Sequence, residues 1–413
     1  MVMKSFLITN GTIIDVKNSK ILENHEILIE NNVIKDVGPE KSLSTDEETK
    51  VIDVEGAFIL PGFIDTHVHL MAQGFRMEDN MYNPLALHFY QALDNMKKTL
   101  EAGVTTVRDM GLADIGVKLA ADRGLFPAPR MQISVMPLSI TGGHFDFFLN
   151  SGFDMKISYP GLPQSICDGP EEVRKRTREV LRAGAEVIKV MVTGGVMSVN
   201  DRPEFTQFTV EELKAVVEEA NFRDGIKVSA HAHGAEGMKN ALEAGIHSIE
   251  HGTYLDEEVC QMMVEKGAYL VPTFVVIRIN KEKALEGDLP HYSIQGALEI
   301  ARVHQENMEM AYQAGVKMVM GTDSGVVEHG QNLMELKYLC EMGMEPMEAI
   351  QAGTIRAAEC LGWHDCLGSL EKGKLADLVV VKRDPVDDIE SLSLPDNVLM
   401  VMKDGKIFKN ILD

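Results

Sequence analysis

Two histidines spaced to share one metal ion stand at the end of an apolar run. The segment FIDTHVH ends in His67 and His69. In an extended strand, residues i and i+2 face the same side, so both imidazoles can reach one ion. A single His-x-His is common by chance, and a buried core histidine is the ordinary alternative. The position of this pair, after Pro61–Gly62 and an apolar strand, favours metal binding.

Lys189 is a second unusual residue, because it lies within the apolar segment VIKVMV. A lysine is rarely buried without a partner, and burial favours its neutral amine. A neutral amine reacts with carbon dioxide to give a carbamate, whose two oxygens can bridge two metal ions. The alternatives are a side chain that reaches solvent at the end of the strand or an ion pair with a carboxylate.

Three more apolar segments end in residues of the same kinds. VSAHAHG contains His231 and His233, SIEHG contains His251, and VMGTDSG contains Asp323. Each histidine alone would be explained as a core residue. Together with Lys189, however, these residues predict a metal centre assembled from several strand ends. Asp323 can also accept a proton during a reaction.

The elements that must position these residues alternate regularly. From Phe58 to residue 364, short apolar segments typical of buried strands alternate with helical patterns. Eight strand–helix units are counted when Phe58–Asp65 is taken as the first strand. This predicts a (β/α)8 barrel, whose active site lies at the carboxyl ends of the strands; a doubly wound open sheet is the alternative. The other predicted strands are Val104–Arg108, Arg130–Val135, Val187–Val192, Ile226–His231, Ser248–His251, Tyr269–Thr273 and Met318–Gly321.

Both ends of the chain have the pattern of short strands and turns. Asn10–Gly11 lies between two apolar stretches and predicts a hairpin turn. We therefore expect an α/β protein of two domains. Residues 58–364 form the (β/α)8 TIM barrel of a metal-dependent hydrolase, and residues 1–57 and 365–413 together form a small β-sandwich.

These motifs resemble the amidohydrolase superfamily over nearly the whole chain. The resemblance is carried by PGFIDTHVH, VIKVMVTGG, SAHAHG, IEHGT, GTDSG and KGKLADLVVV. Within the superfamily the chain looks most like the Xaa-Pro dipeptidase-like branch, prolidase-type metallo-carboxypeptidases that release a C-terminal amino acid. SAHAHG and the TGGH segment at 141–144 carry this finer resemblance. The imidazolonepropionase group is more distant and normally uses one metal, and Lys189 argues against that closer assignment.

The resemblance implies two divalent metal ions, expected to be zinc, which suits imidazole and carboxylate ligands. His67 and His69 would bind the first ion with Asp323, and His231 and His251 the second, with Lys189 N-carboxylated by carbon dioxide as the bridge. A hydroxide bridging the metals would attack the substrate carbonyl. Asp323 would take its proton and pass it to the leaving nitrogen. The implied metal ligands are His67, His69, Lys189, His231, His251 and Asp323.

Three further residues are candidates for contact with the substrate. His233 is expected to face the substrate. His144 lies in the long segment 136–169, which has the length of a functional lid, and could donate a hydrogen bond to the substrate carbonyl; an ordinary loop histidine is the alternative. Arg278 follows the seventh strand and could bind a substrate carboxylate, although a solvated surface arginine explains it equally well. We interpret Arg108–Asp109 as structural.

The predicted function is hydrolysis of Xaa-Pro-like dipeptides or N-acyl amino acids by a binuclear metal-dependent dipeptidase or carboxypeptidase. The alternative is an imidazolonepropionase-like hydrolase of a non-peptide amide, urea, lactam or ester, because such sites share the metal centre and differ in their loops. A non-catalytic barrel used for binding would be expected to lack some of the ligands, and none is missing here. The residues do not identify the amino acid that is released.

Composition limits the partners of this 413-residue chain. Its net charge of −23 disfavours nucleic acids and anionic membranes. The five cysteines include no CxxC pair, which favours a reducing cytoplasm. No signal peptide and no apolar run of membrane-spanning length is recognised. We expect a small-molecule substrate and, because relatives often assemble, a homo-oligomer.

Overall fold

The central part of the protein is built on parallel strands. The structure is a computed structural model that describes residues 5–74, 82–196, 201–289 and 291–412. Among these residues, β6, β7 and β8 form one parallel sheet, and β9 to β13 form another. Helices lie between successive strands, which confirms the α/β class. The strands are β6 Phe63–Val68, β7 Val104–Asp109, β8 Arg130–Ile133, β9 Val187–Met191, β10 Lys227–Gly234, β11 Ser248–Tyr254, β12 Tyr269–Val271 and β13 Lys317–Met318.

Backbone hydrogen bonds join the two parallel sheets at two places, between β8 and β9 and between β6 and β13. Beyond β8, the N–H of Leu138 donates to the carbonyl of Lys189 in β9 at 2.9 Å. On the other side, Thr66 in β6 donates to the carbonyl of Met320, beyond β13, at 3.0 Å. Regular strand pairing is interrupted at both places, so the pairing gives two sheets of three and five strands among the described residues rather than one continuous sheet.

The helices begin and end at residues suited to those positions. Thr209 and Glu212 form a capping box at the start of α5. Helices α6 and α7 end at Gly245 and Gly267, whose φ angles of 93° and 65° suit glycine. In the described parts of the chain, every helix is too short or too polar to cross a membrane. The helices are α2 Leu85–Glu101, α3 Ile115–Asp122, α4 Gly169–Arg182, α5 Val210–Asn221, α6 Ala235–Ala244, α7 Glu257–Lys266, α8 Phe274–Glu286, α9 His291–Gln313, α10 Met334–Glu341, α11 Pro346–Ala352 and α12 Ile355–Leu361.

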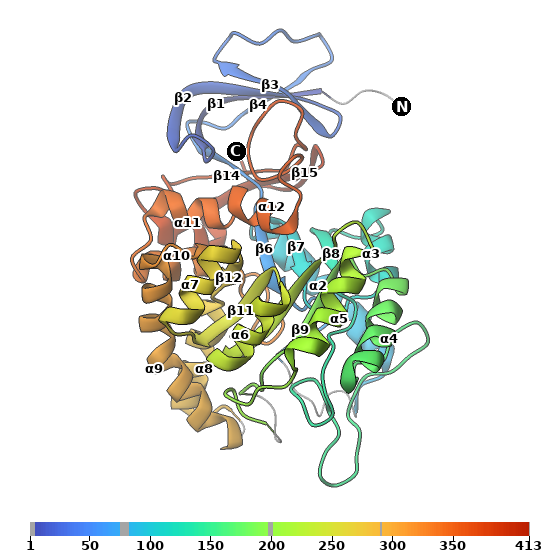
Figure 1. The fold of residues 1–413 in the computed structure, drawn as a ribbon. Coiled ribbons are helices and arrows are strands. Elements are labelled where there is room, and N and C mark those ends of the chain that lie inside the picture. Colours follow the sequence, from blue (N-terminus) through green and yellow to red (C-terminus); the bar gives the residue numbers. More distant parts are fainter. Residues whose placement is uncertain (1–4, 75–81, 197–200, 290, 413) are drawn as a thin grey trace.

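Strands from both ends of the chain form a separate sheet. Strand β5 pairs antiparallel with β14, so the expected pairing of the two ends is confirmed. The pairing gives one sheet of eight strands in the described residues, with its own hydrophobic cluster, and does not show the two layers of a β-sandwich. This terminal sheet lies at one end of the molecule, and the long loop after β8 projects from the other (Figure 1). Its strands are β1 Ser5–Asp15, β2 Lys20–Glu30, β3 Val33–Pro39, β4 Lys50–Asp53, β5 Phe58–Pro61, β14 Leu378–Val381, β15 Val398–Lys403 and β16 Lys406–Asn410.

Two local predictions were wrong. Asn10–Gly11 is not a hairpin turn: β1 continues through it, Asn10 takes a φ of 57°, and the register with β2 shifts on both sides of Gly11 as at a β-bulge. The predicted strand Phe58–Asp65 divides at Gly62 into β5 of the terminal sheet and β6 of the parallel sheet. A Cβ at Gly62 would lie 2.2 Å from Oγ1 of Thr105. The chain therefore passes from the terminal sheet to the parallel sheet at a position that has no room for a side chain.

Candidate metal centre

One group of candidate ligands comes from the end of β6, from the residue that follows it and from the loop after β13. The Oδ1 atom of Asp323 lies 3.5 Å from Nε2 of His67 and 3.3 Å from Nε2 of His69. One candidate ligand atom from each of the three lies within 4.8 Å of the others, and all three residues are buried. Asp323 has a φ of 60°, a left-handed conformation that is uncommon without glycine and is concentrated at functional sites.

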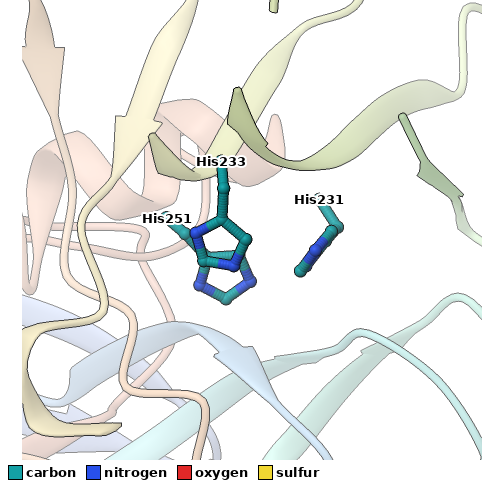
Figure 2. Close-up of side chains that lie close together, drawn as sticks. All are labelled: His231, His233 and His251. Atoms are coloured by element: carbon teal, nitrogen blue, oxygen red, sulfur yellow. The ribbon is translucent and has the colours of Figure 1, made fainter. Parts of the chain in front are cut away.

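A second group consists of three histidines from neighbouring strands. His231 and His233 lie on β10 and His251 on β11, with ligand atoms again within 4.8 Å of one another. Figure 2 shows the rings of His233 and His251 overlapping, with His231 beside them. The stacked pair has a centroid distance of 5.0 Å, and the His231 ring lies 4.7 Å from that of His251.

Hydrogen bonds on the outer side of each imidazole leave the other ring nitrogen facing the cluster. Nδ1 of His67 donates to Oε2 of Glu250 at 2.7 Å. Nε2 of His231 donates to the carbonyl of Gly194 at 3.1 Å, which leaves its Nδ1 with a lone pair. Nδ1 of His251 lies 2.8 Å from Oγ1 of Thr273. Such bonds fix the tautomer and orientation that a metal-binding histidine needs.

Burial also keeps four of the five imidazoles neutral. The exception is His69: burial lowers its pKa, but the hydrogen bond and the charge of Asp323 outweigh burial and raise it. Burial lowers the pKa of His67 to about 4 and that of His233 to about 3. Burial and the neighbouring histidines lower the pKa values of His231 and His251 well below their usual value. Without metal, these rings therefore carry lone pairs rather than protons near pH 7, and neutral imidazole is the form that binds metal.

Lys189 lies in the middle of β9, and only 1% of it is exposed. Its Nζ has no hydrogen-bond partner among the described residues, although it lines the same cavity as both histidine groups. Burial lowers the pKa of Lys189 to about 8, and the negative charges of Glu250 and Asp323 partly oppose this shift. A buried amine without a partner and with a depressed pKa is the starting material for carbamate formation.

Glu250 was missed in the sequence, although it lies beside His251 in β11. Its carboxylate accepts hydrogen bonds from His67, from Arg108 at 2.9 Å and from Ser248 at 2.8 Å. These partners hold its pKa below the usual range despite burial, with Arg108 as the largest favourable cause. The sequence could have indicated Glu250, because a glutamate inside an apolar strand is rarely buried without a partner, as is true of Lys189.

The donor atoms fit divalent metal ions. Neutral imidazole nitrogens and a carboxylate are common zinc ligands. Oδ1 of Asp323 and Nζ of Lys189 are both buried, and neither atom makes a hydrogen bond among the described residues. Leaving such groups unpaired in a protein interior is unfavourable. Cations bound by the two groups would give Lys189, as its carbamate, the partner that its Nζ lacks, and would add a positive charge beside Oδ1 of Asp323.

His144 lies beside this cluster, as the sequence suggested. Its ring stacks on that of His231, with 4.3 Å between centroids and an interplanar angle of 16°. Nδ1 of His144 lies 3.7 Å from Oδ2 of Asp201, and its backbone N–H donates to Gln207. The side chain of Gln207 in turn donates to Asp201 at 2.9 Å, so this pair holds the loop that carries His144. Neither Asp201 nor Gln207 was singled out in the sequence.

Arg278 is not brought to the cluster. It lies on α8, where its guanidinium donates to Gln305 at 2.6 Å, pairs with Glu341 at 3.5 Å and lies over the ring of Tyr338. It does not line the cavity at the histidines. Its contacts with α9 and α10 are those of a surface arginine, and its role in binding a substrate carboxylate stays a prediction.

Comparison with known proteins identifies relatives of this chain. Residues 58–408 match the Amidohydrolase family. Ochratoxinase of Aspergillus niger is 37% identical over 94% of this chain and 83% of its own length. A crystal structure of a Xaa-Pro dipeptidase with bound methionine is 36% identical, covers 98% of this chain and 100% of its own, and has a TM-score of 0.89. A prolidase complexed with N-methylphosphonate-L-proline is 31% identical over 98% of this chain and 100% of its own, with a TM-score of 0.91. The chain therefore belongs to the amidohydrolase family, in its prolidase-like branch.

Proposed function

We propose that this amidohydrolase uses two divalent metal ions to hydrolyse N-acyl amino acids or dipeptides. Membership of the family makes it a hydrolase that acts on amide bonds. The observation that carries the finer proposal is that two buried groups of candidate ligands and the unpartnered Nζ of Lys189 line one cavity. One group of ligands would be explained by a single ion. A second group and an amine able to become a bridging anion favour two.

The proposed roles follow the geometry of the side chains. His67, His69 and Asp323 would hold one ion, and His231 and His251 would hold the other. Lys189 would be a further ligand as its carbamate, which forms when the neutral amine attacks carbon dioxide, makes a nitrogen–carbon bond and releases one proton. The metals, expected to be zinc, supply Lewis-acid activation of water and of the substrate carbonyl.

The chain's own polar groups then move protons and orient the substrate. Oδ1 of Asp323 lies near Nε2 of His67 and Nε2 of His69, and we propose that this carboxylate accepts a proton and later delivers it to the leaving nitrogen. His144 lines the same cavity and can donate a hydrogen bond to the carbonyl oxygen. His233 lies beside His251, and we propose that it contacts the substrate rather than acting as a resident ligand.

We also infer the architecture around the site. The bonds that join the two parallel sheets at both edges support a closed (β/α)8 barrel made from β6 to β13. We propose 58–364 as the barrel domain and 1–57 with 365–413 as the smaller domain. The place of β5 in the terminal sheet indicates that the structural boundary lies near Gly62. The sandwich form of the smaller domain stays a prediction.

The nature of the substrate is a narrower proposal. Two structural relatives are described as a Xaa-Pro dipeptidase and a prolidase, and one curated relative as an ochratoxinase. These names favour an amide between an acyl group and an amino acid. The alternative is a non-peptide amide, urea, lactam or ester. The prediction that Arg278 binds the substrate carboxylate is left without geometric support.

The cellular setting is also part of the proposal. All five cysteines are free thiols, which favours a reducing cytoplasm. Assembly as a homo-oligomer stays a prediction, to be checked by light scattering after size-exclusion chromatography. The acidic chain is proposed to meet small molecules rather than nucleic acids or membranes.

Metal content and activity together test the proposed function. The purified protein should contain two zinc ions per chain by elemental analysis and release amino acids from a panel of dipeptides and N-acyl amino acids. A chelator should abolish this activity and zinc should restore it. Lys189→Ala should lose both metal and activity, whereas Lys175→Ala on α4 should retain both. Full activity of Lys189→Ala would remove the bridging role, and full activity without metal would overturn the proposal.

A further inference from the structure

The loop after β9 contains a glycine that the imidazole of His144 requires. A Cβ added to Gly195 would lie 2.1 Å from Cε1, 2.5 Å from Nδ1 and 2.6 Å from Nε2 of His144, so any other side chain would overlap the ring. The φ angle of Gly195 is outside the left-handed region, and its backbone conformation is therefore open to other residues. The ring of His144, rather than the backbone, accounts for the glycine.

The position of the ring is also restricted by His231. The two imidazoles stack, with 4.3 Å between their centroids and 16° between their planes. Nε2 of His231 donates to the carbonyl of Gly194 at 3.1 Å, so the residue before Gly195 holds the ring on which His144 stacks. The contacts with Gly195 and His231 together determine both the place of the His144 ring and the direction of its plane.

Asp201 holds Gly195 in place and faces the same ring. Its side chain is only 3% exposed. Oδ1 of Asp201 accepts the N–H of Gly195 at 3.4 Å, and Oδ2 lies 3.7 Å from Nδ1 of His144. Oδ2 also accepts a hydrogen bond from the side chain of Gln207 at 2.9 Å. One buried carboxylate therefore meets the glycine, the imidazole and the glutamine that bonds the backbone of His144.

Gln207 fixes the backbone of His144 to the chain just beyond β9. Oε1 of Gln207 accepts the N–H of His144 at 3.0 Å, and the N–H of Gln207 donates to the carbonyl of Val192 at 2.9 Å. A Cβ added to Gly143 would lie 2.7 Å from the same Oε1 atom, so glycine at 143 allows the close approach of Gln207. The segments TGGH at 141–144 and TGG at 193–195 are thus explained by one contact between two loops.

Fastening two loops together is one explanation of these contacts, but the surroundings of the ring indicate a further role. His144 lines the cavity that also contains both groups of candidate ligands and Lys189. A glycine increases the conformational freedom of the unfolded chain and so weakens a loop. If stability alone decided, a position that needs no left-handed φ would favour a larger residue than Gly195. The network instead keeps space for an imidazole beside the proposed metal ligands.

We propose that Asp201, Gln207 and Gly195 are positioning residues, which fix the imidazole of His144 where it meets the carbonyl oxygen of the substrate. The inference rests on the proposed function, in which His144 donates a hydrogen bond to that oxygen. Such a bond accelerates a reaction when the donor is already in place as charge develops on the oxygen. A displacement of the donor by about 1 Å can lower the rate about 100-fold. The three residues act through His144 and are assigned no contact with the substrate.

A double-mutant cycle on the zinc-loaded enzyme tests this assignment, with the dipeptide or N-acyl amino acid that the wild type hydrolyses best. His144→Ala should lower kcat about 100-fold. Gly195→Ala should lower kcat about 100-fold as well, with a much smaller change in KM. Because the overlap disappears with the ring, the double variant should have the same kcat as His144→Ala, whereas independent losses would multiply to about 10,000-fold. Elemental analysis should find two zinc ions per chain in all three variants.

Two further variants separate positioning from folding. In Asp201→Asn, the new amide NH2 group faces the N–H of either Gly195 or Gln207, so kcat should fall about tenfold, with no further fall when His144→Ala is also present. This variant carries the kinetic test if Gly195→Ala does not fold. Gly296→Ala on α9 is the matched control, because a Cβ there would lie 3.4 Å from Val196, in ordinary contact, and kcat and KM should stay at the wild-type values.

Stability measurements separate this inference from the proposed function. In urea denaturation of the metal-free protein, Gly195→Ala should lower the midpoint of the wild type and leave that of His144→Ala unchanged. If this result is obtained but the wild type hydrolyses no amide of the panel, the placement of His144 by these residues stands and the proposed function fails. The inference is overturned if the losses in kcat multiply in the double variant or if Gly195→Ala loses zinc. It is also overturned if Gly195→Ala costs the same stability with and without the His144 ring.

Discussion

At the scale of single residues, the site depends on hydrogen bonds that orient the imidazoles of the candidate ligands. His67, His251 and His231 each use one ring nitrogen to bond the protein, and the bond fixes where the other nitrogen points. The bond from His67 ends on Glu250, which Arg108 and two serines also hold. Such outer partners of metal-binding histidines contribute strongly to metal affinity.

Replacing Glu250 should therefore weaken metal binding without removing a ligand. In Glu250→Gln, the amide lacks the charge that pairs with Arg108 and holds His67. We expect zinc affinity to fall by about 10- to 100-fold, measured by competition with a chromophoric chelator. Glu219→Gln, at a glutamate that is 5% exposed and pairs with arginines on α4, is the matched control and should bind zinc normally. Normal zinc affinity in Glu250→Gln would show that its contacts do not act on the metal site.

The proximity of the candidate ligands could be predicted from the sequence because their placement follows a local rule. Parallel strands deliver their carboxyl ends to one edge, so a histidine at a strand end is near other strand ends whatever the details of packing. Glu250, Asp201 and the surroundings of Arg278 depend on contacts between distant segments. Arg108 and Glu250, for example, lie 142 positions apart. The residue pattern within one strand cannot predict such a pairing.

At the scale of elements, the start of α8 is held by a distant carboxylate. Glu335 on α10 accepts the N–H groups of Phe274 and Val275, each at 2.8 Å. These are the first residues of the helix that follows Thr273, and Thr273 bonds His251. The contact therefore links the cap of one helix to the orientation of a proposed ligand.

This contact predicts a pH dependence of stability. Burial raises the pKa of Glu335 from 4.5 to about 8, although the two N–H bonds oppose the shift. The stabilisation from protonated Glu335 is thus fully present below pH 4.5 and is lost as the pH rises through about 8. The difference in unfolding free energy between wild type and Glu335→Gln should fall from pH 5 to pH 8 in urea denaturation. A difference that is constant over this range would contradict the prediction.

Boundaries between elements were the least predictable part of the fold. Asn10–Gly11 has the composition of a hairpin turn, but the pairing of β1 with β2 continues beyond it and makes it a bulge. The apolar run from Phe58 to Asp65 has no sequence break other than Pro61–Gly62, and only the pairing of β5 with β14 shows that it serves two sheets. Both outcomes are decided by partner strands, one of them more than 300 residues away in the sequence.

At the scale of the whole molecule, a cluster of ion-paired side chains links the terminal sheet to the parallel strands. Arg130, at the start of β8, lies 2.6 Å from Asp377 beside β14 and 2.6 Å from Asp404 after β15. The arginine side chain is 16% exposed and that of Asp377 is 5% exposed. Burial lowers the pKa of the guanidinium, but the two carboxylates outweigh this effect and raise it, so the arginine stays charged.

Removing the arginine should weaken the joined structure. Arg130→Met leaves Asp377 buried without its counter-charge, and we expect a loss of about 3 kcal/mol in unfolding free energy. Arg383→Met removes an exposed ion pair with Asp388 and should cost less than about 1 kcal/mol. Urea denaturation of the two variants compares them directly. Equal losses would mean that Arg130 does not join the two parts.

The position of the ligands on both parallel sheets has a consequence for the synthesis of the protein. His67 leaves the ribosome 256 residues before Asp323, the last of the proposed ligands in the chain. During most of translation the nascent chain therefore carries histidines but lacks the carboxylate that stands beside His67 and His69. High-affinity zinc capture by the group of His67, His69 and Asp323 is expected only after the second sheet has met the first. Metal loading would thus distinguish finished chains from those that stopped early.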